Sequence, residues 1–88
     1  MHTPDSELAE RLRAAEERVV IGGRYTHYKD TAKTYLVEGL AIAEADESLQ
    51  VIYRAEYGAK VLFTRPLQSW LDDVESNGQI VKRFTLVG

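Results

Sequence analysis

An apolar stripe at helical spacing opens the chain. Its members recur every three or four residues, at Leu8, Leu12, Ala15 and Val19. This spacing places side chains on one face of a helix. Thr3 suits the N-cap position and Pro4 the first helical position, so we expect the helix to begin there. We predict an accessory helix over residues 1–18 that packs on one small domain over residues 19–88.

From residue 24 onward, alternating, β-branched and aromatic residues are typical of strands. We predict four consecutive strands, over residues 24–29, 34–43, 49–57 and 60–65, and a last strand over 79–87. Polar or glycine-containing turns separate them, at Asp30-Thr31, 44–48, Gly58-Ala59 and Asn77-Gly78. Gly39 lies inside the second strand and predicts a bend or bulge there.

A second, shorter helical segment precedes the last strand. Pro66 ends the strand pattern, and helical spacing follows at Leu67, Trp70, Leu71 and Val74. We therefore predict a short helix over residues 66–73. The order of elements favours a mainly β fold (α+β overall), a small SH3-like curved antiparallel barrel of about five strands with an N-terminal amphipathic helix. A helix packed on an open, curved antiparallel sheet is the alternative.

Composition narrows the class of protein. The 88 residues suffice for one hydrophobic core, and 44% hydrophobic against 28% charged residues indicates a globular domain rather than a disordered chain. The absence of cysteine excludes disulfides, thiol catalysis and cysteine-ligated metals. No signal-peptide pattern starts the sequence, and no apolar run approaches the ~20 residues that span a bilayer. We expect a cytoplasmic protein without a membrane segment.

Charge bears on the choice of partner. The formal net charge is −3, and the acidic excess lies mostly in residues 1–18. Proteins that coat nucleic acids carry a basic excess, which releases counterions on binding. The charge therefore argues against generic coating of nucleic acid and leaves specific binding of a single strand open.

The first candidate site is an aromatic cluster on the first strand. Alternation places Tyr25 and His27 on one face and Tyr28 on the other. A histidine between tyrosines can act as a general base, a proton shuttle or a stacking platform. The structural interpretation, which we favour, is a half-buried histidine at the rim of a small core. His2 is the only other histidine, so the sequence predicts no paired-histidine metal site.

Two arginines on later strands are the next candidates. Arg54 lies between Tyr53 and Tyr57 on a strand, where it either pairs with an acid such as Glu38 or Glu56 or forms a fork for an anion. We favour the ion pair. Arg65 ends the fourth strand, where it either meets a ligand at the mouth of a barrel or ties down a loop.

Other residues point to structure rather than chemistry. The spacing of Trp70 indicates a core position. The acidic residues Asp72, Asp73 and Glu75 form either a metal cluster or, as we favour, a solvated face. The chain has no phosphate-binding glycine loop, nucleophile elbow or zinc-binding helix motif. We predict no catalytic residue, no metal and no cofactor.

Several of these segments together form one known pattern. They are residues 23–29 (GRYTHYK), Tyr35 with Val37, residues 52–58 (IYRAEYG), Arg65-Pro66 and Arg83-Phe84. In this order, over residues 23–84, they resemble a bacterial family called domain of unknown function 1653. The resemblance implies a bacterial, cytoplasmic, small β domain and implies no particular activity.

The chain departs from the family pattern in three places. Phe63 stands where the family usually has tryptophan, and Trp70 where a phenylalanine is expected. The turn over residues 44–48 is shorter and lacks a histidine that the family often places there, with Ala45 as its nearest counterpart. If that histidine belongs to a site, this chain has lost or altered it.

The residues support three functional hypotheses. The leading one is a non-catalytic module that binds a peptide, a nucleotide or single-stranded RNA. Its binding residues would be Tyr25, His27, Tyr28, Tyr53, Arg54, Tyr57 and Arg65. The alternative is a small enzyme or small-molecule site with His27 as base and Arg54 or Arg65 as anion clamp. The third is a structural role, with both arginines buried in ion pairs. A free strand edge also leaves a homodimer open.

Overall fold

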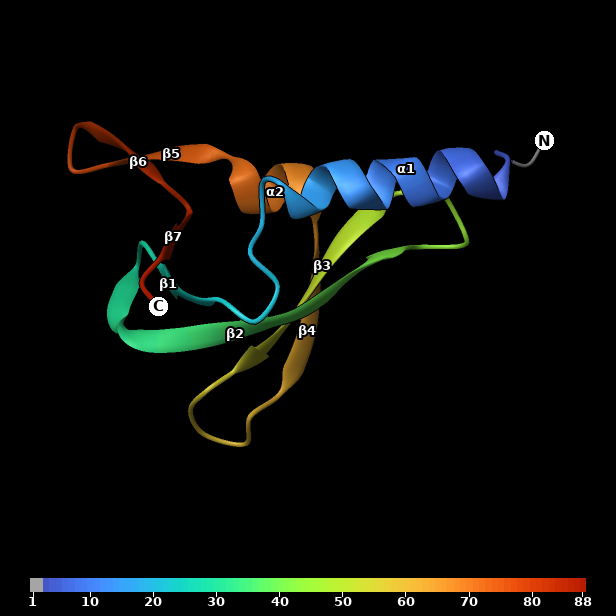
Figure 1. Ribbon diagram of the computed structural model, residues 1–88. Helices are drawn as coiled ribbons and strands as arrows, with labels where there is room; N and C mark the ends of the chain where they lie inside the picture. Colours follow the sequence, from blue (N-terminus) through green and yellow to red (C-terminus); the bar gives the residue numbers. More distant parts are fainter. Residues whose placement is uncertain (1–2) are drawn as a thin grey trace.

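The computed structural model describes residues 3–88, and these form a β sheet with two helices along one side of it (Figure 1). In chain order the elements are α1 (Asp5–Glu16), β1 (Arg24–His27), β2 (Asp30–Ile42), β3 (Leu49–Ala55), β4 (Leu62–Pro66), α2 (Leu67–Leu71), β5 (Asp73–Ser76), β6 (Gln79–Lys82) and β7 (Phe84–Leu86). The mainly β fold with an N-terminal helix and a short helix before the last strand is confirmed. His2, weighed above as a metal ligand, lies outside the described residues.

Five strands form one antiparallel sheet in the order β4-β3-β2-β1-β7. The long strand β2 joins its two halves, because its start pairs with β1 and its end with β3. Within residues 3–88 no closed barrel is found, and β4 and β7 form the two edges of the sheet. The last strand predicted from the sequence includes residues 79–82. In the structure these residues pair with β5 in a separate hairpin. The open sheet was the alternative prediction.

A bulge in β2 keeps apolar side chains on one face of the sheet. Tyr35 and Val37 pair with β3, the register then shifts at Gly39, and Leu40 pairs with Val51. An extra residue in one strand reverses the alternation of its side chains relative to the partner. Val37 and Leu40 therefore both belong to the core region although they are three residues apart. The bulge predicted at Gly39 is confirmed.

The core lies between the sheet and the two helices, which run along one side of it (Figure 1). Its buried members are Val19, Tyr25, Val37, Val51, Tyr53, Trp70 and Phe84. Trp70, on α2, stacks on Phe84 of β7 with ring centroids 3.7 Å apart and planes within 6°. Tyr25 meets the same tryptophan edge to face at 5.2 Å. The core position predicted for Trp70 is confirmed.

The predicted apolar stripe of the first helix faces this core. Leu8 and Leu12 are partly buried, while Ala15 and Val19 are 3% and 0% exposed. The helix begins one residue later than predicted, because Pro4 takes the N-cap position and no side chain caps the helix. Thr3 instead donates its hydroxyl to a carboxylate oxygen of Glu47 at 2.5 Å, in the turn between β2 and β3.

Gly23 is buried where the chain passes from α1 into β1. A Cβ atom built there would lie 2.8 Å from a side-chain carbon of Leu86 and 3.0 Å from the carbonyl oxygen of Val20. Such approaches are closer than packed atoms tolerate, so this position accepts only glycine without a shift. The glycine that begins the family-like segment is thus explained by packing.

The C-terminal third differs most from the prediction. The short helix covers residues 67–71 rather than 66–73, and Val74 lies on β5. β5 and β6 form a hairpin around the predicted Asn77-Gly78 turn. A bend at Arg83 divides the predicted last strand, so that β6 pairs with β5 and β7 with β1. Neither described helix is long and apolar enough to cross a membrane.

The core assignment predicts the effect of removing its largest side chain. Trp70→Ala leaves a cavity beside Phe84 and Tyr25, so we expect the free energy of unfolding to fall by about 3–5 kcal/mol. Ile80→Ala is the control, because this side chain is 70% exposed and surface changes usually stay within about 0.5 kcal/mol. Urea denaturation measures both, and equal losses in the two variants would contradict the assignment.

Candidate binding pocket

A small hollow opens on the inner face of the sheet, the face that carries the core. Its volume is about 300 Å³, and its lining residues are His27, Tyr35, Tyr53, Tyr57, Phe63, Arg65 and Phe84. Each of the five strands supplies at least one of them, with Tyr57 placed just after β3. Tyr53 and Phe84 are 7% and 5% exposed and form the floor. Tyr57 and Phe63, 36% and 41% exposed, form the rim.

His27 stands at one wall of this pocket. Its ring lies 5.0 Å from Phe84, edge to face, and 4.7 Å from Tyr28. Its Nδ1 accepts a hydrogen bond from the backbone N–H of Lys29 at 3.2 Å, which leaves Nε2 as the proton-bearing nitrogen of the neutral ring. Burial lowers the pKa of His27, and the charges of Arg65, Arg83 and Lys29 lower it further. The histidine therefore favours its neutral form.

Arg65 supplies the positive charge of the pocket. Its guanidinium carbon lies 5.4 Å from the centre of the Phe84 ring, and Nη1 donates to the hydroxyl of Ser69 at 2.9 Å. Its Nε is buried without a hydrogen-bond partner among residues 3–88, as is the Nε of Arg83. Neither arginine forms an ion pair in this part of the chain. The buried ion pair that the structural hypothesis predicts for Arg65 is therefore wrong.

Three tyrosines join the rim of the pocket to its floor. The hydroxyls of Tyr35 and Tyr57 are 2.9 Å apart. This hydrogen bond, with burial, raises the pKa of Tyr35 to about 12. Tyr35 also meets Tyr53 edge to face at 5.6 Å, and Phe63 stacks on Tyr53 at 5.7 Å. The lining residues include no acid, so the pocket combines aromatic walls with uncompensated positive charge.

The pocket contains four of the seven residues that the sequence suggested for binding: His27, Tyr53, Tyr57 and Arg65. Tyr25 lies on the same strand as His27 but belongs to the core, 6% exposed, where its hydroxyl accepts the N–H of Val20. Tyr28 packs beside His27 and lines a different hollow, next to β6.

Arg54 lies outside the pocket. Its partner in β2 is Leu36, on the outer face of the sheet. Its Nε donates to a carboxylate oxygen of Glu38 at 2.6 Å, and Nη1 donates to the carbonyl of Lys60 at 3.0 Å. With 39% of the arginine side chain and 35% of the glutamate exposed, this is the favoured ion pair with Glu38, at the surface rather than buried.

Sequence reasoning missed three lining residues, Tyr35, Phe63 and Phe84. Tyr35 and Phe84 belong to the family-like pattern, which was the available signal. The acidic segment over residues 72–75 lies on β5 and the residue before it, not on a helix. Across residues 3–88 there is no group of three or more histidine and acidic side chains placed to hold a metal ion.

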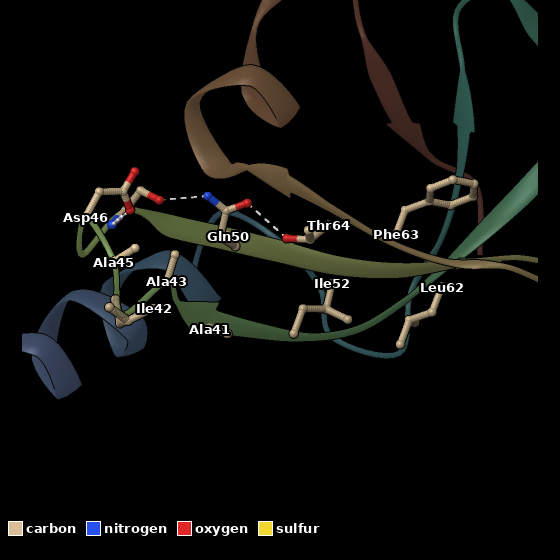
Figure 2. A pocket seen from close by; sticks show the side chains of 11 residues that line it. Ala41, Ile42, Ala43, Ala45, Asp46, Gln50, Ile52, Leu62, Phe63 and Thr64 are labelled. Carbon is tan, nitrogen blue, oxygen red and sulfur yellow. Dashed lines mark hydrogen bonds between the residues drawn. The ribbon is translucent and has the colours of Figure 1, made fainter.

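A second, larger hollow lies on the outer face, across β4 from the first. It measures about 640 Å³ and is lined mainly by apolar side chains of β2, β3, β4 and the turn between β2 and β3. Figure 2 shows Ile52 and Leu62 pointing to this side of the sheet, whereas Phe63 points to the other. The side chain of Gln50 bridges Ser48 and Thr64 through hydrogen bonds of 2.7 and 2.9 Å (Figure 2).

The lowered pKa of His27 predicts a loss of stability in mild acid. Below about pH 6.5 the unfolded chain binds a proton that the folded chain resists, so the free energy of unfolding falls as the pH falls. His27→Gln should make stability flatter between pH 7.5 and pH 5. Urea denaturation of both proteins across this range measures the difference. A wild-type protein that becomes more stable toward pH 5 would contradict the assigned direction.

Comparison with known proteins covers most of the chain. The family model described as a protein of unknown function, DUF1653, matches residues 23–86. A crystal structure of a DUF1653 protein from Bordetella bronchiseptica is similar, with a TM-score of 0.68 and 33% identity over 76% of this chain and 86% of that one. No curated protein matches. The segments that resemble the family in the sequence, within residues 23–84, all lie inside the matched range. The chain belongs to the DUF1653 family.

Proposed function

We propose that this domain is a non-catalytic binding module whose inner pocket receives the anionic group of a ligand, a carboxylate or a phosphate. One observation carries the proposal: Arg65 lines an aromatic pocket beside His27 with no acid to balance its charge. Elsewhere on this sheet the exposed arginines are paired, Arg24 with Glu56 and Arg54 with Glu38. Arg65 and Arg83, both without an ion pair among residues 3–88, differ from these two, and the charges of both act on His27.

The physical argument rests on the cost of a charge removed from water. A partly buried guanidinium loses hydration and regains stability when an anion accepts its hydrogen bonds. The buried and unpartnered Nε of Arg65 shows that this guanidinium has lost part of its hydration without gaining a full set of partners. The faces of aromatic rings supply part of the compensation, as Phe84 does here. An anion would supply the rest, and it would also offset the charges around His27.

Pocket size limits what can enter. A volume of about 300 Å³ is at the lower end for small-molecule sites, so we expect one charged group with a short or flat attachment. The exposed rings of Tyr57 and Phe63 offer stacking or apolar contact to that attachment. A peptide, a nucleotide or the end of a single strand each carries such a group.

The enzymatic alternative has partial support. His27 and Arg65 share the pocket, and a lowered pKa keeps the imidazole ready to accept a proton. Arg54, the other proposed clamp, is on the opposite face and paired. With a single clamp and no serine, threonine, lysine or carboxylate in the lining, we favour binding over catalysis.

Three sequence-based expectations remain part of the proposal. We propose a cytoplasmic location in a bacterium, and an accessory role for residues 1–18 beside a domain over 19–88. We also propose an SH3-like relationship. The last strand of the sheet pairs with β1, and a short helix precedes it, which supports an open variant of that arrangement.

Removing the pocket arginine should weaken anion binding. Inorganic phosphate and a nucleoside monophosphate, titrated into the labelled chain and followed by ¹H–¹⁵N spectra, should shift the amides of residues around His27 and Arg65. Arg65→Met should weaken binding at least about tenfold, the effect of losing one or two charged hydrogen bonds.

Arg54→Met is the matched control, because it removes the same charge from the outer face. Equal weakening in the two variants would point to general attraction of anions. Shifts confined to residues far from the pocket would also overturn the proposal.

A further inference from the structure

Strand β4 is an exposed edge of the sheet. It pairs with β3 alone within residues 3–88. Three neighbouring apolar side chains lie at its start: Val61 just before the strand and Leu62 and Phe63 within it, which are 49%, 47% and 41% exposed. Proteins usually shield such edges, because unpaired backbone groups beside apolar side chains attract another strand. Here Pro66 shields the end of the strand, and Arg65 is the charged side chain within it.

The register identifies which backbone groups are free. The N–H of Ala55 donates to the carbonyl of Val61 at 3.0 Å. Bonded and unbonded residues alternate along an antiparallel pair, so Phe63 also bonds toward β3. The N–H and C=O groups of Leu62 and Thr64 then point away from the sheet. A further strand would find these four groups available.

The two hollows lie on opposite sides of this edge. Phe63 and Arg65 of β4 line the inner pocket, while Leu62 and Thr64 line the outer hollow shown in Figure 2, which Phe63 also borders. Side chains of an added strand alternate between the same two faces. Consecutive residues of that strand would therefore approach the cationic pocket and the apolar hollow in turn.

We propose that an extended segment of another protein adds to β4 as a sixth strand, with an acidic side chain facing Arg65 and aliphatic side chains facing the outer hollow. Such strand addition is a common mode of peptide recognition, with main-chain bonds for affinity and alternate side chains for specificity. The acidic position rests on the proposed function of the pocket. The strand addition rests only on the free edge and the outer hollow.

Charge favours an acidic partner over a second copy of this chain. Residues 60–66 carry Lys60 and Arg65 and no acid. Two β4 strands paired antiparallel about Phe63 would place Arg65 opposite Val61 and Lys60 opposite Pro66, so neither base would gain an acidic partner. A glutamate on the added strand would instead pair with Arg65, since opposite charges across paired strands are stabilising.

A short blocked peptide tests the proposal on the full chain. The probe is an acetylated and amidated peptide of valine and threonine with one central glutamate, titrated by NMR. We expect shifts of the Leu62 and Thr64 amides. Two N-methylated peptides provide the control, one methylated at the odd-numbered residues and the other at the even-numbered residues. Only one of these two sets of N–H groups faces β4. The peptide methylated on that set should lose at least tenfold in affinity, and the other should bind normally.

Two variants separate the parts of the proposal. Thr64→Pro removes the outward N–H, and Thr64→Val is its control, since both lose the hydroxyl that donates to Gln50. Only the proline variant should weaken the peptide. Arg65→Met should abolish the preference for glutamate over glutamine at the central position.

Several outcomes would overturn the inference. The two methylated peptides could lose affinity equally, or the peptide could shift the amides of β7 in place of β4. The amides of Leu62 and Thr64 could also shift with protein concentration in the absence of peptide, which would identify a second copy as the occupant. Equal affinity for the glutamate and glutamine peptides would overturn the acidic position. Binding of inorganic phosphate without binding of any peptide would overturn strand addition and leave the proposed function intact.

Discussion

The Phe84 ring connects the hydrophobic core to the candidate pocket. One of its faces is covered by Trp70 at 3.7 Å, which ties α2 to the last strand of the sheet. His27 meets the same ring edge to face, and the guanidinium of Arg65 lies 5.4 Å from its centre. Loss of this ring would loosen the last strand and remove the pocket floor that contacts both the imidazole of His27 and the guanidinium of Arg65. The stability of the fold and the shape of the candidate pocket therefore both depend on the side chain of Phe84.

Local pattern was sufficient to predict much of this fold. The first helix, the first four strands and the bulge at Gly39 follow from periodicity and residue type. The last segment does not, because residues 79–87 have one continuous β pattern whose two halves pair with different strands. Pairing between distant strands depends on packing that no local pattern contains. The same limit hides the β5–β6 hairpin.

The candidate site shows the same division. Alternation along the strand already predicts that Tyr53 and Arg54 lie on opposite faces. The observed register agrees, because Arg54 lies opposite Leu36 on the outer face. Arg65 lies opposite Val51, on the face that carries the core. Tyr25 and His27 share a strand, yet the first is covered by Trp70 and the second opens onto the pocket. Which end of a strand is covered depends on the helices, so sequence alone could not separate these two residues.

An overall charge of −3 thus coexists with a local positive site. The pKa of the His27 ring, measured by NMR with and without saturating sulfate, tests this account most directly, because sulfate keeps its charge across the range where histidine titrates. In the free protein the pKa lies below its ordinary value, through burial and the nearby bases. An anion at Arg65 offsets those charges, so sulfate should raise the pKa of His27 in the wild type and leave it unchanged in Arg65→Met. The same pKa in the wild type with and without sulfate would contradict the account.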